Sequence, residues 1–317
     1  MKKKIGILLC LMLLLLTGCG SSTSIRFGAA DVGGMYYTVA NAFNGLVSDE
    51  TSKYHYEVRT TAGSAANLRL LSSSYIDLGI AQADLVDEAY HGTGSFSKTP
   101  YQGYRAVASL YTEACQIVVR ADSDIQTLDD LQGHTVSVGA EESGTEQNAS
   151  QILTLSGLTS DLVKTVNLDY TEAASKLASG EIDAMFCTAG IRTAVIDELA
   201  TSCSIRLISV SDSCLNKLLA TSSAYSRYTI PANTYNGQTE EVTTIGVKAV
   251  LLASDKLSDE MVESLTTTLF AHAQDLAYVT SLEVAYDETE ATTGVTIPFH
   301  PGAAAYYEKQ GITVPTN

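Results

Sequence analysis

The chain has 317 residues, with 36 Asp and Glu against 19 Lys and Arg, which gives a formal net charge of −17 at pH 7. This acidity argues against nucleic acid as a partner and against a basic face that binds membranes. The length exceeds that of one typical hydrophobic core, so we expect two lobes.

The N-terminal residues have the pattern of a secretory signal. A basic head, Met1 to Lys4, precedes an apolar run from Ile5 to Leu16. This run is shorter than the roughly 20 residues that a membrane-spanning helix needs. Leu16-Thr17-Gly18-Cys19 then resembles a bacterial lipobox, whereas the alternative is a plain signal peptide with an incidental cysteine. We predict a signal peptide at residues 1–18, a lipid on Cys19, a flexible tether at residues 19–24, and a location on the outer face of the cell membrane or in the periplasm.

Residues 135–149 combine three short patterns that favour an anion site. Thr135 to Val138 is a β-branched run typical of a buried strand. Gly139 to Gly144 follows as a turn, and a helical pattern begins at Thr145, with Ser143 or Thr145 as the expected N-cap. The unpaired N–H groups of such a helix start attract a carboxylate. The alternative is an ordinary connection between a strand and a helix.

The same order of patterns recurs earlier in the chain. A strand at residues 25–29 leads through the turn with Gly33 and Gly34 into a helical pattern. A strand at residues 54–60 leads to Ser64, which we expect to cap the next helix, with Asn67 one turn inside. Alternating strands and helices predict an α/β fold with parallel sheets covered by helices on both faces. Ligands on such sheets bind where strands end and helices begin.

The lobes are expected to be joined by two extended segments. Apolar runs at residues 105–110 and 115–120 flank Tyr111-Thr112-Glu113-Ala114, which we interpret as the crossing to the second lobe. Residues 243–253 form a β-rich run long enough to return, whereas residues 225–238 look polar and irregular. We therefore predict lobe 1 at residues 25–111 plus 244–317 and lobe 2 at residues 112–243. Cys203 and Cys214 fit either a disulfide or free buried thiols.

Several segments together resemble the TAXI subfamily of solute-binding proteins, which serve TRAP (tripartite ATP-independent periplasmic) transporters. The segments follow one another over nearly all of the chain after the signal. They are Gly33-Gly34-Met35-Tyr36-Tyr37, residues 63–68, 77–84, 108–111 and 116–120, Val138-Gly139-Ala140, Ser143-Gly144-Thr145-Glu146, Thr188-Ala189-Gly190, residues 229–231, and His300-Pro301-Gly302-Ala303.

The resemblance implies a two-lobe, periplasmic-binding-protein-like (type II) clamshell, in which each lobe has a mixed, mostly parallel sheet flanked by helices. It implies a monomeric solute receptor that delivers a small carboxylate or amino acid, such as glutamate, glutamine or a 2-oxoglutarate-like acid, to TRAP permease subunits in the membrane. It calls for no cofactor and no metal. The candidate ligand-binding residues are Gly33, Gly34, Met35, Tyr36, Ser64, Asn67, Gln82, Tyr111, Ser143, Gly144, Thr145, Thr188, Ala189 and Gly190.

The sequence departs from this family beside the expected anion site. Asp31 and Met35 stand where small hydroxyl residues are common, Ala83 replaces a common Ser, and Glu142 stands where Gly is usual. A carboxylate of Glu142 in the site would oppose a ligand carboxylate and favour a ligand ammonium, whereas one that points outward would do neither.

Two other functional classes stay open from the sequence. No GxSxG, HExxH or paired Cys and His motif occurs, so we do not expect an enzyme. A clamshell lipoprotein that presents its ligand to a signalling receptor would have the same fold. For either receptor role, we expect the solute to bind carboxylate first, and the lobes to close about the crossings near Tyr111 and Thr243.

Overall fold

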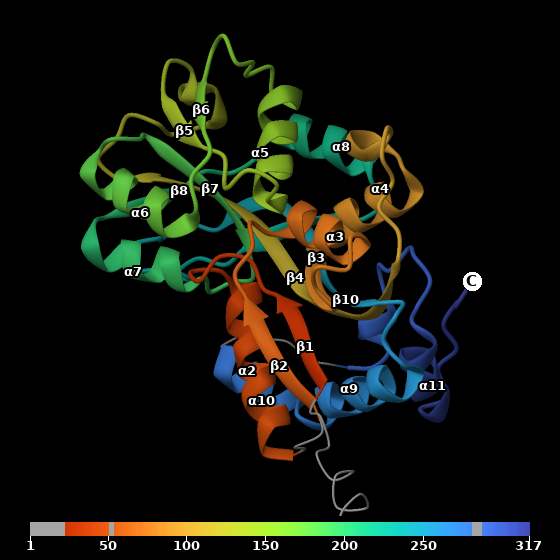
Figure 1. Ribbon diagram of the computed structural model, residues 1–317. Helices are drawn as coiled ribbons and strands as arrows, with labels where there is room; N and C mark the ends of the chain where they lie inside the picture. The colour runs from red at the N-terminus through yellow and green to blue at the C-terminus, as the bar shows by residue number, and fades with distance from the viewer. Residues whose placement is uncertain (1–22, 51–53, 281–286) are drawn as a thin grey trace, which may run out of the picture.

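The computed structural model describes residues 23–50, 54–280 and 287–317 (Figure 1). The predicted signal peptide and Cys19 lie outside these residues. One sheet runs through the molecule in the order β2-β1-β3-β10-β4-β7-β5-β6, with β8 added beside β4 and β9 beside β10. None of the helices in the described ranges combines the length and the apolarity that a membrane crossing requires.

Strands and helices alternate along most of the chain. In order, the elements are β1 (Thr23–Gly28), α2 (Met35–Glu50), β2 (Tyr54–Arg59), α3 (Ser64–Ser72), β3 (Leu78–Gln82), α4 (Ala83–His91), η2 (Gly94–Phe96), β4 (Tyr104–Arg120), η3 (Leu128–Leu131), β5 (Thr135–Ser137), α5 (Gly144–Leu155), β6 (Lys164–Val166), α6 (Tyr170–Ser179), β7 (Ala184–Ala189), α7 (Ala194–Ser202), β8 (Ile205–Leu207), α8 (Asp212–Thr221), β9 (Tyr225–Ile230), β10 (Val242–Ser254), α9 (Asp259–Ala271), α10 (Ala273–Thr280), η4 (Glu290–Thr292) and α11 (Pro301–Lys309).

Parallel pairing is found at the two ends of the sheet and antiparallel pairing at its centre. β1 pairs in parallel with β2 and β3, and β5 pairs in parallel with β6 and β7. The long strands β4 and β10 are antiparallel to each other and to their other neighbours. The expected mixed α/β fold with flanking helices is therefore confirmed.

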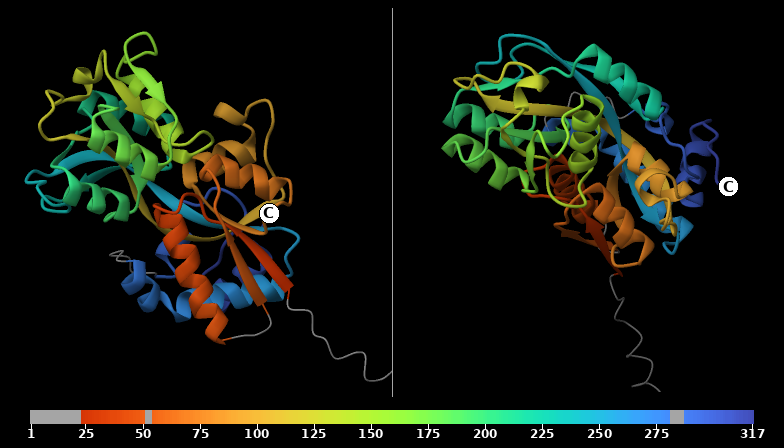
Figure 2. Two further views of the ribbon diagram at one scale, coloured as in Figure 1. Left: turned by 60° about the vertical axis from the view of Figure 1, so that its left-hand side comes forward. Right: turned by 90° about the horizontal axis from the view of Figure 1, so that it is seen from above.

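The strand β4 connects the two parts of the molecule. Residues 104–114 pair with β10, whereas residues 114–120 pair with β7 and β8. β4 and β10 run between the part with α5 to α8 and the part with β1, β2, α2 and α9 (Figures 1 and 2). The extended crossings expected near Tyr111 and over residues 243–253 are thus strands, while the exact lobe boundaries stay predictions.

The structure corrects or decides three expectations about individual segments. Residues 225–230, expected to be irregular, form β9, which pairs with β10. Only the two ends of β9 are buried, so its sequence lacks the apolar alternation of a core strand. The strand expected to begin at residue 25 begins at Thr23, so β1 includes the last two residues of the predicted tether. Cys203 and Cys214 are free thiols, so the disulfide is not formed.

Candidate functional site

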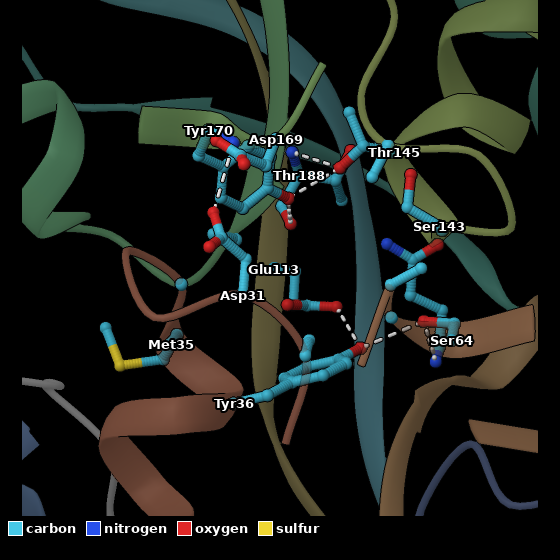
Figure 3. Close-up of a pocket in the computed structure, with 18 residues that line it drawn as sticks. Asp31, Met35, Tyr36, Ser64, Glu113, Ser143, Thr145, Asp169, Tyr170 and Thr188 are labelled. Atoms are coloured by element: carbon cyan, nitrogen blue, oxygen red, sulfur yellow. Dashed lines mark hydrogen bonds between the residues drawn. The ribbon is translucent and has the colours of Figure 1, made fainter. Parts of the chain in front are cut away.

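A cavity lies where the first residues of α2, α3, α5 and α6 approach one another from both parts of the molecule (Figure 3). Its volume is about 40 Å³, which is room for roughly three water molecules. A solute of amino-acid size therefore requires the two parts to move apart before it enters. The lining residues are Ala30, Asp31, Gly34, Met35, Tyr36, Ala62, Gly63, Ser64, Gln82, Glu113, Ala140, Ser143, Gly144, Thr145, Asp169, Tyr170, Thr188 and Ala189.

Most of the candidate ligand-binding residues line this one cavity, although they come from distant parts of the chain. They are Gly34, Met35, Tyr36, Ser64, Gln82, Ser143, Gly144, Thr145, Thr188 and Ala189. The fold brings them together because each lies at or just after the carboxyl end of a strand or begins a helix. β3 and β7 run in opposite directions, and their last residues, Gln82 and Ala189, both lie beside the middle of the β4–β10 pair. Their contact with a solute stays a prediction.

Asn67 and Tyr111 are buried but do not line the cavity. The Asn67 amide donates hydrogen bonds to the carbonyl oxygens of Gly28 (3.3 Å) and Ile80 (2.9 Å) and accepts one from the Thr61 hydroxyl (2.7 Å). These bonds use the side chain to join β1, β3 and α3. Tyr111 is 2% exposed in the middle of β4. In this form both side chains lie within the fold, and their contact with a solute stays a prediction.

Gly33 and Gly190 also lie away from the cavity lining. A side chain at Gly33 would meet Thr171 and Val195, which belong to α6 and α7. The carbonyl of Gly190 accepts a hydrogen bond from the Thr193 hydroxyl (2.8 Å) in the turn after β7. These two glycines shape the turns beside the site.

The helix starts are capped in different ways. Ser143 is the N-cap of α5, and its hydroxyl accepts a hydrogen bond from the Glu146 N–H (3.0 Å). The expectation that Ser64 caps α3 is wrong, because Gly63 holds the N-cap position with a φ of 127°. The Ser64 hydroxyl accepts instead from the Gln82 N–H (3.1 Å). It therefore links α3 to the end of β3 inside the cavity.

Glu113 is one of the cavity residues, with Asp31, Asp169 and Tyr170, that the sequence did not predict as ligand-binding. Its side chain comes from β4 and is 1% exposed. The Tyr36 hydroxyl donates to Glu113 Oε2 (2.8 Å) and lies 3.3 Å from the Ser64 hydroxyl. Burial raises the pKa of Glu113 to about 8, against the lowering effect of hydrogen bonds from Tyr36 and Gln82. The sequence indicates Glu113 only as a single acidic residue between the apolar runs at residues 105–110 and 115–120.

Asp31 and Tyr170 connect the two parts of the molecule at the other end of the cavity. The backbone N–H of Tyr170 donates to Asp31 Oδ2 (3.1 Å). Burial, and then the charge of Asp169, raise the pKa of the Asp31 carboxyl. The Tyr170 hydroxyl lies 2.6 Å from the Thr145 hydroxyl and donates to the Thr188 carbonyl (2.9 Å). This network fixes the lining contributed by α5, α6 and β7.

Glu142 points away from the cavity, which decides between the two orientations open from the sequence. Its carboxylate accepts two hydrogen bonds from the Arg69 guanidinium (2.8 and 2.6 Å). The pair is about 40% exposed and joins α3 to the loop before α5. Exposed pairs of this kind contribute about 0–1 kcal/mol. The pair therefore adds little to the contact between α3 and the loop before α5, and it leaves the charge inside the cavity unchanged.

Residues 27–311 match the NMT1-like family over nearly all of the described chain. The chain belongs to the NMT1-like family. The fold of this family member is similar to that of a binding protein component of an ABC phosphonate transporter from Pseudomonas aeruginosa, with a TM-score of 0.54, 12% identity, and coverage of 83% of this chain and 80% of that one. It is also similar to the alkanesulfonate-binding protein from Xanthomonas axonopodis pv. citri bound to MOPS, with a TM-score of 0.50, 16% identity, and coverage of 82% and 80%. At these identities the similarity concerns the fold, which is the clamshell of periplasmic binding proteins.

Gly144 should be required for tight solute binding. A Cβ at this position would overlap the terminal amide of Gln82, so the amide must turn away from its place in the cavity. The loss of a hydrogen bond to a charged ligand group costs about 1.5–3 kcal/mol. We expect Gly144→Ala to weaken the binding of the best amino acid or dicarboxylate by roughly 10- to 100-fold in isothermal titration calorimetry. Gly45→Ala is the matched control, because a Cβ there meets open space within α2. Equal affinities of the two variants would contradict this role of Gly144.

Proposed function

We propose that this member of the NMT1-like family is an extracytoplasmic solute receptor, anchored by a lipid on Cys19, that captures a small carboxylate or amino acid between its two lobes. The observation that carries the proposal is the cavity at which α2, α3, α5 and α6 begin. Helix starts supply N–H groups for a ligand carboxylate. Buried side chains such as Tyr36, Ser64 and Gln82 then add fixed hydrogen-bonding partners around it.

Capture depends on a change between an open and a closed form. The described form is closed, because Ala66 N–H donates to the Glu142 carbonyl (3.1 Å) and Tyr170 N–H donates to Asp31 across the cavity. In the open form the solute binds one lobe, and bending of β4 and β10 brings the other lobe onto it. The solute stabilises the closed form by the difference between its binding free energies for the closed and the open form.

The membrane partner in this proposal is a TRAP-type permease. The support is the run of sequence motifs shared with TAXI receptors, from Gly33-Gly34-Met35-Tyr36-Tyr37 to His300-Pro301-Gly302-Ala303. The structural neighbours carry the names of ABC transporter components and binding proteins, so an ABC permease is the competing partner. A role as sensor for a signalling receptor is the second candidate. Uptake of the bound solute that requires an ion gradient but no ATP would favour the TRAP partner over both.

A thermal-shift screen tests the receptor function directly. We expect at least one amino acid or small dicarboxylate to raise the midpoint of unfolding by several degrees. The reason is that a ligand at 100 times its dissociation constant adds about 2.7 kcal/mol to the free energy of unfolding. A nucleotide and a neutral sugar serve as controls for unspecific effects. No shift with any amino acid or carboxylate would overturn the proposed ligand class.

A further inference from the structure

The charges around the cavity have one sign. Among the described residues that line it, Asp31, Glu113 and Asp169 are acidic, and none is Lys, Arg or His. Figure 3 shows the carboxyl groups of Asp31 and Glu113 on the side of the cavity opposite Ser143 and Thr145. A dicarboxylate bound here would bring its own negative charges next to these groups, with no basic side chain in the lining to offset them.

Among the residues that the structure describes, no cationic group acts on Glu113. Its hydrogen bond from the Tyr36 hydroxyl and the one from the Gln82 side chain both come from neutral groups. The negative charge of Asp84 also acts on it and raises the pKa of Glu113 further. A buried carboxylate is costly unless a positive charge is paired with it. An ammonium group of a bound solute would supply that charge.

Gln82 adds a second acceptor at the same place. The residue is 2% exposed, and its Oε1 atom has no hydrogen-bond partner among the described residues. Buried polar atoms are nearly always paired in folded proteins. Because Oε1 only accepts hydrogen bonds, the group that satisfies it must be a donor. An ammonium group carries three donors and can serve Glu113 and Gln82 together.

The start of α5, which lies beside the Gln82 amide, has the opposite preference. Gly144 and Thr145 begin α5, and the first N–H groups of a helix have no partner inside it. The partial positive charge at this end favours a carboxylate. The cavity therefore offers acceptors on Glu113 and Gln82 next to the N–H donors of α5, which matches a solute with an ammonium and a carboxylate on neighbouring atoms.

From this arrangement we infer that the solute is an amine-bearing acid, such as an α-amino acid, and that Glu113 with Gln82 holds its ammonium group. The inference rests on the proposed receptor function and narrows its ligand class. It makes Glu113 the residue that separates amino acids from the matching 2-oxo acids. Dicarboxylates without an amine, including 2-oxoglutarate, are then poor ligands for this chain.

Matched pairs of ligands test the inference on the full protein. The pairs are L-alanine with pyruvate and L-glutamate with 2-oxoglutarate, because each pair differs only in the amine, and further amino acids with their 2-oxo acids follow the screen. We expect the amino acid of the binding pair to bind at least tenfold more tightly than its 2-oxo acid in calorimetry at pH 8. In Glu113→Gln, amino acid affinity should fall at least tenfold and the affinity for the 2-oxo acid should not fall. Glu263→Gln is the control, because Glu263 lies on α9 and pairs with Lys309.

The possible outcomes separate the inference from the receptor function. A 2-oxo acid that binds as tightly as its amino acid overturns the inference alone, since a protonated Glu113 would then be donating to a ligand carbonyl. Discrimination that persists in Glu113→Gln also overturns it, provided that the variant unfolds as cooperatively as the unmodified protein. If no amino acid, amine or carboxylate binds at all, the proposed function fails and the inference fails with it.

Discussion

Gly302→Ala should lower the free energy of unfolding by about 3 kcal/mol or more. Gly302 is buried in the first turn of α11, where that helix packs on α9. An added Cβ would overlap the carbonyl oxygen of Asp259 and lie 2.9 Å from the backbone nitrogen of Glu263. Both atoms belong to the backbone, so a side-chain rotation cannot make room and the two helices must separate. Overpacking in cores costs about 1–3 kcal/mol, and more where the backbone has to move.

The effect of Gly302→Ala can be separated from the general effect of alanine by the same change at Gly45. A Cβ at Gly45 meets open space within α2, so replacing a helical glycine there should raise the free energy of unfolding by about 0.5–1 kcal/mol. Urea denaturation of both variants measures the two effects under identical conditions. A Gly302→Ala protein as stable as the unmodified protein would show that α11 and α9 tolerate separation. The packing of α11 on α9 gives Gly302 a structural role although it lies outside the cavity lining.

Local signals in the sequence predicted the parts of the site that depend on neighbouring residues. The turns before Tyr36, Ser64 and Thr145 were identified from small residues between a strand pattern and a helix pattern. These turns lie close together because β1 to β3 in one part and β5 to β7 in the other run toward each other, so that their carboxyl ends face the same space. The cavity that contains Tyr36, Ser64 and Thr145 follows from that arrangement.

The sequence could not predict which groups the site uses when their partners are far away in the chain. Glu113 acquires its role from Tyr36, which is 77 residues away, and Asp31 acquires its contact from Tyr170, which is 139 residues away. Asn67 was expected in the cavity, but its amide donates hydrogen bonds to carbonyl oxygens of β1 and β3 instead. Spacing along the chain carries no information on such contacts. The sequence predicted a site for a ligand carboxylate, and only the structure shows that Asp31 and Glu113 also line this site.

Glu113→Gln should make the protein more stable than the unmodified protein at pH 8 and above, with little difference near pH 4. Burial raises the pKa of Glu113 from 4.5 to about 8 in the folded protein. Between these two values the unfolded chain loses a proton that the folded protein retains, so rising pH favours unfolding. The full difference corresponds to roughly 4–5 kcal/mol. A glutamine at this position carries no charge and retains an acceptor for the Tyr36 hydroxyl, so the variant should lack this decline.

The groups that surround Glu113 allow its contribution to be isolated. The titratable groups that interact with it are Tyr36 from α2, Asp84 from α4, Tyr170 from α6 and Cys187 from β7. Burial raises the pKa values of Tyr36, Tyr170 and Cys187, so these groups stay neutral up to pH 8. Asp84, whose pKa is also raised by burial, is present in both proteins. The difference between the two curves of unfolding free energy against pH therefore reports mainly Glu113.

Urea denaturation of both proteins at intervals from pH 4 to pH 9 measures this difference. It should be near zero at pH 4, grow through neutral pH and level off above pH 8. Two parallel curves would mean that Glu113 has an ordinary pKa and reaches solvent in the folded protein. Repeating the series with a saturating amino acid adds a second check, because a bound ammonium lowers the pKa of Glu113 and should flatten the decline in the unmodified protein. The same carboxyl group would then weaken the solute-free closed form at neutral pH and strengthen the form that holds an amine.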